Sequence, residues 1–266
     1  MFVVRRTVPI LLLAAALAGC GSHRSATETT PPPAPTATTT PTPNPTTTQE
    51  ATSAFHVYFL RDGKVAPVAR TVSGTGVAVA ALRALAAGPT DEERAQGLTT
   101  QLTSGNAVTG VSIDSGVATV TLNEDLSHAA LAELVYTLTQ FPTVQAVRTS
   151  RMISGAPSLT RATFEDVTPQ ILVESPLPNE TVTSPLRVRG TANTFEATFD
   201  LELQDASGRT IVKRFVTATS GSGTRGTYDT QLAFPTSSGR LTLVAYEPSA
   251  ENGKPLHVVR IPLDGS

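Results

Sequence analysis

The chain has a single cysteine, Cys20, and no tryptophan, and its other aromatic residues are four tyrosines and nine phenylalanines. One thiol cannot form a disulfide within the chain, so hydrophobic cores must stabilise its folded parts. A metal site built from several thiolates is excluded for the same reason. The scarcity of tyrosine and tryptophan also argues against a platform of aromatic rings that stacks on sugars.

Charge is scarce and balanced. Lys and Arg number 20 against 22 Asp and Glu, which gives a formal net charge of −2 at pH 7. The sequence has no clustered basic stripe of the kind that neutralises phosphates, so nucleic acid is not an expected partner.

The N-terminus has the pattern of an export signal. Two arginines precede an apolar run over residues 8–17, and small residues follow it. The run is about half the roughly 20 residues that a membrane-spanning helix needs. We therefore predict that residues 1–19 are a signal peptide that is removed and does not remain as a membrane span.

Residues 17–20, Leu-Ala-Gly-Cys, resemble the bacterial lipobox. The resemblance implies that Cys20 begins the mature protein and carries diacylglycerol on its sulfur, because a thiolate is the nucleophile that forms this thioether. N-palmitoylation of Cys20 is left open. Two acyl chains hold a protein stably at a bilayer, so the expected location is the extracytoplasmic face of the cell membrane, with the lipid bilayer as a partner. The alternative is an ordinary secretory signal with a chance cysteine.

Ser, Thr, Pro and Ala dominate the sequence from the cysteine to position 54. These residues provide almost no apolar side chains to bury, so ordering them would lose entropy without a compensating gain. We predict that residues 20–54 form a lipidated, disordered linker, and composition leaves O-glycosylation of its threonines open.

Residues 55–165 combine strand and helix signals. Asp62-Gly63 is a hairpin-turn dipeptide, Pro67 favours an edge strand, and residues 90–93 have the sequence of a capping box. The expected strands are 55–60, 65–68, 108–113, 117–122 and 144–148, and the expected helices are 77–87, 90–97 and 127–141. This order predicts a compact α+β domain.

From residue 168 to residue 266 no helical period is present. Turn signals separate seven short β-rich runs: 171–173, 186–188, 197–203, 211–216, 228–234, 241–246 and 256–261. Seven strands at this spacing predict an all-β, antiparallel sandwich of immunoglobulin type. The cysteine pair and tryptophan of antibody domains are missing from this region, so the prediction concerns architecture alone.

Both regions resemble known domain families. Residues 55–153 resemble the GerMN domain, in 57–59 (Val-Tyr-Phe), 81–90 (Ala-Leu-Arg-Ala-Leu-Ala-Ala-Gly-Pro-Thr) and 134–142 (Leu-Val-Tyr-Thr-Leu-Thr-Gln-Phe-Pro). Residues 170–263 look like the Gmad-type immunoglobulin-like domain, in 173–176, 184–190 and 193–197. The pairing implies a bacterial, notably actinobacterial, lipoprotein that is not an enzyme. GerMN domains are similar to ring-building folds that act as protein–protein modules. The family has no assigned catalytic residues that could be matched to positions of this chain.

Two motifs suggest chemistry, and a structural interpretation is favoured for each. Residues 221–226 match Gly-x-Gly-x-x-Gly, but a dinucleotide site requires a helix after the motif, and a strand pattern follows it instead. The histidines, His23, His56, His128 and His257, are scattered without the i, i+4 spacing of a helical zinc site. A Ser-His-Asp arrangement stays open, because a triad is defined in space.

Two acidic clusters, residues 91–93 and 124–125, are interpreted as favourable charges at helix N-termini and not as paired acid–base carboxylates. The apolar stripe over residues 131–141 is interpreted as core. No catalytic, cofactor or metal residue is assigned, and the only site residue is the lipid-bearing Cys20. The leading functional hypothesis is a non-enzymatic interaction or scaffold protein of the cell envelope, with other envelope proteins as partners. A binder of cell-wall glycan (peptidoglycan) or of a small ligand is the alternative, and a hydrolase is third.

Overall fold

The computed structural model describes residues 52–102, 108–235 and 239–266. The predicted signal peptide at residues 1–19, the predicted lipid attachment at Cys20 and nearly all of the predicted linker at 20–54 lie outside the described residues. Within the described part of the chain, no helix is long and apolar enough to cross a membrane.

The first region is α+β. Its elements are β1 (Thr52–Arg61), β2 (Lys64–Ser73), α1 (Val77–Ala87), α2 (Asp91–Ala95), β3 (Leu98–Thr99), β4 (Val108–Asp114), β5 (Val117–Leu122), α3 (His128–Leu138) and β6 (Ala146–Thr149). Every expected helix and strand is present. The ends of α1 and β5 are as expected, and those of the other elements are shifted; β1, for example, begins at Thr52 and not at residue 55. β3 was not predicted, because a strand of two residues carries no periodic signal.

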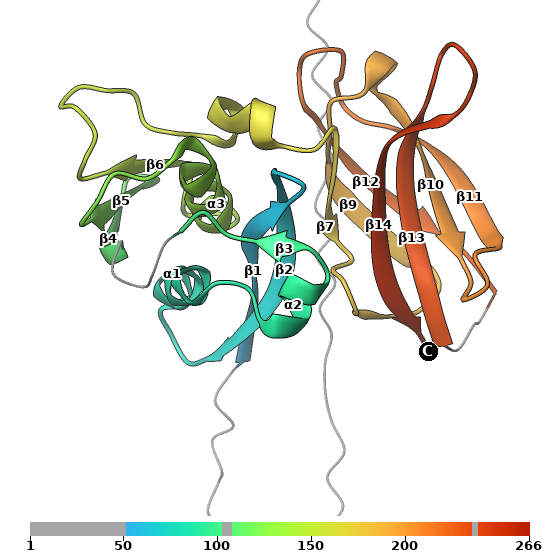
Figure 1. Cartoon of the computed structure of the whole chain (residues 1–266), viewed down its shortest axis with the longest axis horizontal. Helices are drawn as coiled ribbons and strands as arrows, with labels where there is room; N and C mark the ends of the chain where they lie inside the picture. The colour runs from blue at the N-terminus through green and yellow to red at the C-terminus, as the bar shows by residue number, and fades with distance from the viewer. Residues whose placement is uncertain (1–51, 103–107, 236–238) are drawn as a thin grey trace, which may run out of the picture. The chain divides into compact units, whose positions relative to one another are not determined.

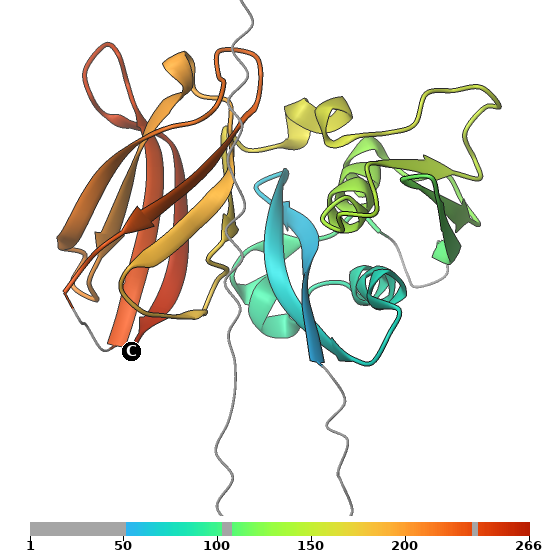
Figure 2. The same ribbon diagram turned by 180° about the vertical axis from the view of Figure 1, so that it is seen from behind.

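The helices α1 and α3 lie between two three-stranded sheets (Figures 1 and 2). The strand order is β2-β1-β3 in one sheet and β4-β5-β6 in the other. β5 and β6 are parallel, and α3 makes the crossover that parallel neighbours require.

Local sequence signals account for the turns and caps of this region. Asp62 and Gly63 form the β1–β2 turn with φ values of 51° and 74°, as a two-residue hairpin turn requires. Pro67 lies on β2, at the edge of its sheet, where a missing N–H group costs no ladder hydrogen bond. Thr90 and Glu93 make both hydrogen bonds of the predicted capping box at the start of α2.

The second region is a β-sandwich. Its strands are β7 (Ile171–Ser175), β8 (Thr181–Val182), β9 (Leu186–Ala192), β10 (Thr198–Gln204), β11 (Thr210–Thr217), β12 (Gly226–Leu232), β13 (Gly239–Pro248) and β14 (Pro255–Gly265). One sheet has the order β11-β10-β13-β14-β8 and the other has the order β12-β9-β7. All seven expected strands are present. The expectation of a wholly antiparallel sandwich is wrong at one place, because the unpredicted strand β8 pairs parallel to β14.

β7 contributes to both hydrophobic cores. Side chains alternate between the two faces of a strand, and Ile171 and Val173 belong to the sandwich core while Leu172 belongs to the α+β core. Glu174 lies at an irregularity of the β7–β9 pairing, and its carboxylate contacts Tyr58 and Arg161. β7 thus brings a carboxylate from the sandwich against the α+β region.

Candidate functional site

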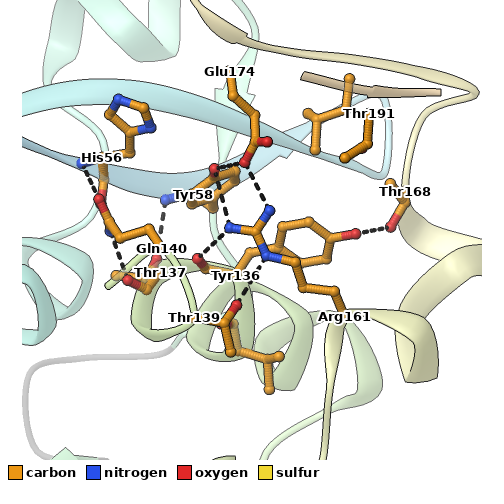
Figure 3. Close-up of polar contacts among 12 residues, drawn as sticks. His56, Tyr58, Tyr136, Thr137, Thr139, Gln140, Arg161, Thr168, Glu174 and Thr191 are labelled. Carbon is orange, nitrogen blue, oxygen red and sulfur yellow. Dashed lines mark hydrogen bonds and ion pairs between the residues drawn. The ribbon is translucent and has the colours of Figure 1, made fainter. Parts of the chain in front are cut away.

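Arg161 lies at the centre of a polar cluster where the two cores meet (Figure 3). It is the first residue of a short 3-10 helix (Arg161–Val167) that precedes β7. Its Nη1 atom is 2.7 Å from Glu174 Oε1. Its guanidinium carbon lies over the rings of Tyr58 and Tyr136, at 5.4 and 4.6 Å from the ring centroids. One side chain therefore connects β1, α3 and β7.

Hydroxyl groups complete this cluster. The Tyr58 hydroxyl donates a hydrogen bond to Glu174 Oε1, the same oxygen that pairs with Arg161. The hydroxyls of Tyr136 and Thr168 share a hydrogen bond of 2.7 Å. Such buried networks fix geometry strongly when each polar group has a partner.

The protonation states also favour a structural role. Burial alone would raise the pKa of Glu174, but the charge of Arg161 and the hydrogen bond from Tyr58 outweigh it, and the pKa is lowered. Burial, together with the charge of Glu174, raises the pKa of Tyr58 well above its ordinary value. At neutral pH Glu174 is therefore ionised and Tyr58 is protonated. Neither group titrates near neutrality, where a general acid or base must operate.

A second ion pair links the 3-10 helix at residues 161–167, which precedes β7, to the sandwich. Arg225 Nε and Nη2 each lie 2.9 Å from an oxygen of Glu165, a two-pronged arrangement. Asn193 Nδ2 donates to Glu165 Oε1 at 2.8 Å. Arg225 also donates to the carbonyl oxygen of Pro169 at 2.8 Å. The segment between the two regions is thus held from both ends.

Residues 221–225 of the glycine-rich motif lie in the loop between β11 and β12, and Gly226 is the first residue of β12. A loop is the structural interpretation expected from the sequence, but a hairpin loop is wrong, because β11 and β12 belong to different sheets. A strand follows the loop, so no helix N-terminus is available for a phosphate. The N–H of Gly223 already donates to Asn193 Oδ1 at 2.8 Å. A Cβ atom on Gly221 would lie 2.5 Å from the Ala197 backbone, and one on Gly226 would lie 2.3 Å from Ser220 N, so these glycines permit close packing.

The described histidines are not brought together. His56 lies on β1, and burial lowers its pKa. His128 Nε2 is 2.9 Å from Asp166 Oδ1, and His257 Nε2 is 3.8 Å from Glu247 Oε2. His23 lies outside the described residues. Within the described ranges no group of three His, Cys, Asp or Glu residues is arranged to hold a metal ion.

The acidic clusters have structural partners. Residues 91–93 occupy the first turn of α2, as predicted. Both oxygens of Glu93 accept hydrogen bonds of 2.7 Å from Arg70, on the neighbouring strand β2. Asp125 Oδ1 lies 2.9 Å from Arg151 Nε. The predicted position at a helix N-terminus is confirmed for residues 91–93. It is wrong for residues 124–125, because they precede the N-cap Ser127 of α3, and the first turn of α3 has no acidic residue.

One unusual carboxyl was missed at the level of sequence. Glu133 is fully buried on α3, and its Oε2 accepts a hydrogen bond of 2.9 Å from the N–H of Gln101. Burial raises its pKa from 4.5 to about 7, although the hydrogen bonds from Gln101 and Thr100 act in the opposite direction. The available signal was its position among apolar residues, in Ala-Leu-Ala-Glu-Leu-Val over residues 130–135.

A cavity of about 840 Å³ borders β7. Its walls come from β2, from the segment that leads into β7, and from β14, and they include the charged residues Arg61, Lys64 and Arg260. A volume of this size is typical of clefts that bind ligands. The junction can therefore hold two domains together and also accommodate a bound molecule beside them.

Comparisons with known proteins agree with this architecture. Residues 56–150 match a family described as "Sporulation and spore germination". Residues 170–254 match a family described as "Immunoglobulin-like domain of bacterial spore germination". Two regions of the chain thus match domain families of sporulation and germination type, and neither description names an enzymatic activity.

A solved structure, the tandem GerMN domains of the sporulation protein GerM from Bacillus subtilis, is similar at 24% sequence identity with a TM-score of 0.37. The similarity covers 46% of this chain and 49% of that chain, so this chain spans about half the length of that structure. No curated protein sequence matches the chain.

Proposed function

We propose that this chain, built from two domains of sporulation and germination type, is a non-enzymatic interaction protein of the cell envelope. In this proposal Cys20 is acylated and holds the protein at the extracytoplasmic face of the cell membrane. The folded part then contacts other envelope proteins. The lipobox-like residues 17–20 support the lipid anchor, and the two family matches support a place in the cell envelope.

The observation that carries this proposal is the ion pair between Arg161 and Glu174. This ion pair joins the two domains. Because the lowered pKa keeps Glu174 ionised at neutral pH, its carboxylate is not used for proton transfer. A fixed arrangement lets both domains contribute to one contact surface. It also reduces the entropy that a partner must remove on binding, which is the general advantage of a preorganised surface.

Exposed apolar side chains indicate where such contacts form. Ile153 is 84% exposed, Phe195 is 62% exposed and Phe215 is 63% exposed. Aromatic side chains are enriched at the centres of protein interfaces. We therefore assign Phe195 and Phe215 of the sandwich, and Ile153 of the α+β region, as the positions to probe.

The test is photo-crosslinking in the native membrane. Benzoylphenylalanine replaces Ile153, Phe195 or Phe215 in the full chain, one position at a time. We expect at least one position to give a discrete adduct with a single protein, and we expect Glu174→Gln to weaken that adduct by loosening the junction. Adducts with abundant bystander proteins alone, at all three positions, would contradict the proposal.

A second candidate is a binder of cell-wall glycan or of a small ligand. The cavity of about 840 Å³ favours it. Co-sedimentation of the full chain with purified peptidoglycan tests this candidate. Sedimentation that an Arg61→Gln variant abolishes would support it, and a chain that stays in the supernatant would rule it out for the wall polymer.

A further inference from the structure

The outer strands of the sheets differ in how their free edges are protected. A free edge offers unpaired N–H and C=O groups to another strand, and folded proteins usually cover such an edge or place charged residues and proline on it. Gln140 covers the edge of β1, because its side-chain amide bonds both the N–H and the carbonyl oxygen of His56. Pro67 lies on the edge strand β2, and the exposed residues Lys213 and Arg214 lie on the edge strand β11.

The edge strand β4 has none of these protections. It is the outer strand of the sheet β4-β5-β6 (Figure 1), and it pairs with β5 alone. It contains no proline, and its only charged side chain is that of Asp114, its last residue. At the other edge of the same sheet, the main chain of Leu159 pairs with Val147 of β6. Of the two edges of this sheet, β4 is therefore the one that is open.

The hydrogen-bond pattern shows which groups of β4 point outward. The N–H of Ser150 donates to the carbonyl oxygen of Val120 at 2.9 Å, so the main-chain groups of Val120 point to β6. Val120 lies opposite Val111, which makes this a non-hydrogen-bonded pair of the β4–β5 ladder. Val111 and, two positions on, Ile113 thus direct their N–H and C=O groups away from β5. Within the described residues, no main-chain group bonds them.

This part of the edge is accessible. Ile113 is 42% exposed, Ser112 is exposed and Val111 is half-buried. The neighbouring helix α1 contacts β4, and its Val79 is 40% exposed. An added strand would therefore reach the outward main-chain groups, and it would cover apolar surface that the monomer leaves in water.

The edge is complementary to itself. When two copies of β4 run antiparallel with Ser112 on the two-fold axis, Val111 of each copy lies opposite Ile113 of the other. Both residues point their main-chain groups outward, so each of these pairs exchanges two hydrogen bonds. Their β-branched side chains meet on the core side of the sheet, where such pairs stabilise it. Asp114 lies opposite Gly110, so no like charges face each other.

We propose that two copies of this chain associate through β4 and join their three-stranded sheets β4-β5-β6 into one continuous sheet. The two-fold pairing uses the same edge of both copies, so the assembly closes as a dimer. The inference goes beyond the proposed function, which concerns contacts with other envelope proteins. The proposed anchor at Cys20 would favour the dimer, because copies tethered to one bilayer have a raised effective concentration.

The first experiment is disulfide crosslinking of the full chain in the native membrane. In the dimer the Cα atoms of Ser112 and its copy are about 4.5 Å apart, which lies within the range of about 4.4–6.8 Å that a disulfide spans. Oxidised Ser112→Cys should therefore migrate as a dimer in non-reducing electrophoresis. Wild type, with Cys20 alone, gives the background.

Thr119→Cys is the matched control for this crosslink. Thr119 is exposed and lies opposite Ser112 on β5, so it shares the same face of the sheet. In the dimer it is three strand spacings from its own copy, or about 14 Å. This distance is too long for a disulfide, and the variant should remain at the wild-type background.

The second experiment places a charge on the edge. Ile113→Lys sets an ammonium group opposite Val111 of the other copy, and it should lower the crosslinked fraction of Ser112→Cys at least tenfold. Leu256→Lys, at a position of β14 that is 45% exposed, is the matched control and should leave the fraction unchanged. Unchanged hydrogen exchange in α3 checks that Ile113→Lys is folded. In soluble Cys20→Ser chain, exchange at the amides of Val111 and Ile113 should slow as the protein concentration rises.

Three results would each overturn the proposal. They are a Ser112→Cys dimer no more abundant than that of Thr119→Cys, a crosslinked fraction that folded Ile113→Lys leaves unchanged, and concentration-dependent protection that misses β4. A disulfide adduct of Ser112→Cys with a different protein would also overturn it and leave the proposed function standing. A Ser112→Cys dimer, together with photo-crosslinks to bystander proteins alone, would support this inference and contradict the proposed function.

Discussion

Leu172 and Val173 are neighbours on β7, and their side chains are buried in two different hydrophobic cores. The strand cannot leave the sandwich without also removing Leu172 from the α+β core. The ion pair of Glu174 with Arg161 adds to this connection, since it too links β7 to the first region. The two cores are thus coupled through three consecutive residues.

Leu172→Ala should destabilise both regions. Leu172 is 2% exposed, and truncation of a buried leucine costs about 2–5 kcal/mol. Because β7 is shared, we expect faster hydrogen exchange both in α3 and in β10. Urea unfolding followed by hydrogen exchange measures this effect, with Leu256→Ala as the control at a position that is 45% exposed. Faster exchange in α3 alone would show that the cores are independent.

Glu174→Gln should lower the free energy of unfolding at pH 7. The ordinary pKa of Glu174 is 4.5, and its pKa in the folded protein is lower. Its contribution is therefore present above pH 4.5 and is lost as the pH falls through the lowered folded value. Loss of a charge-assisted hydrogen bond lowers the free energy of unfolding by about 2 kcal/mol.

The check on Glu174 is denaturant unfolding of both proteins from pH 7 down to pH 3. The difference between wild type and Glu174→Gln should be largest at pH 7 and should shrink below pH 4.5. Arg151→Gln, which removes an exposed ion pair, should cost much less. A pH-independent difference for Glu174→Gln would contradict the assigned charge state.

Glu133→Gln should have the opposite pH dependence. Burial raises the pKa of Glu133 from 4.5 to about 7, so the folded protein favours the protonated form. The wild type is then most stable below pH 4.5, loses stability as the pH rises through about 7, and loses no more at higher pH, where both states are deprotonated. The difference between a pKa of 4.5 and one of about 7 corresponds to a change of about 3 kcal/mol in the free energy of unfolding. We expect the variant to be more stable than the wild type at pH 8, with Glu92→Gln, at an exposed position, unchanged.

Cys20→Ser should release the protein from membranes. The predicted thioether requires a sulfur nucleophile, and removing two acyl chains removes the stable anchor. Fractionation of cells, with immunodetection of the folded part, measures the distribution. Ser25→Ala, in the predicted linker, is the control and should stay with the membrane. Unchanged membrane association of Cys20→Ser would refute the proposed anchor.

Much of the fold follows from short sequence signals. The helix at residues 77–87 has the predicted ends, because Gly88 and Pro89 stop it locally. The turn at Asp62 and Gly63, and the capping box of Thr90, likewise depend on residues within a few positions. The two-residue strands β3 and β8 could not be predicted, since they exist only through their distant partners β1 and β14.

By itself, the amino-acid sequence determined the order of the helices and of every strand except β3 and β8, the α+β and sandwich regions, and the loop character of residues 221–225. These properties depend on local backbone preferences and on hydrophobic period. Only the tertiary structure decided that Arg161 meets Glu174, that Leu172 enters the first core, and that residues of β2, β7 and β14 line one cavity. Such contacts join residues that are distant in the chain, and their energies depend on burial and charge that exist only once both cores have formed.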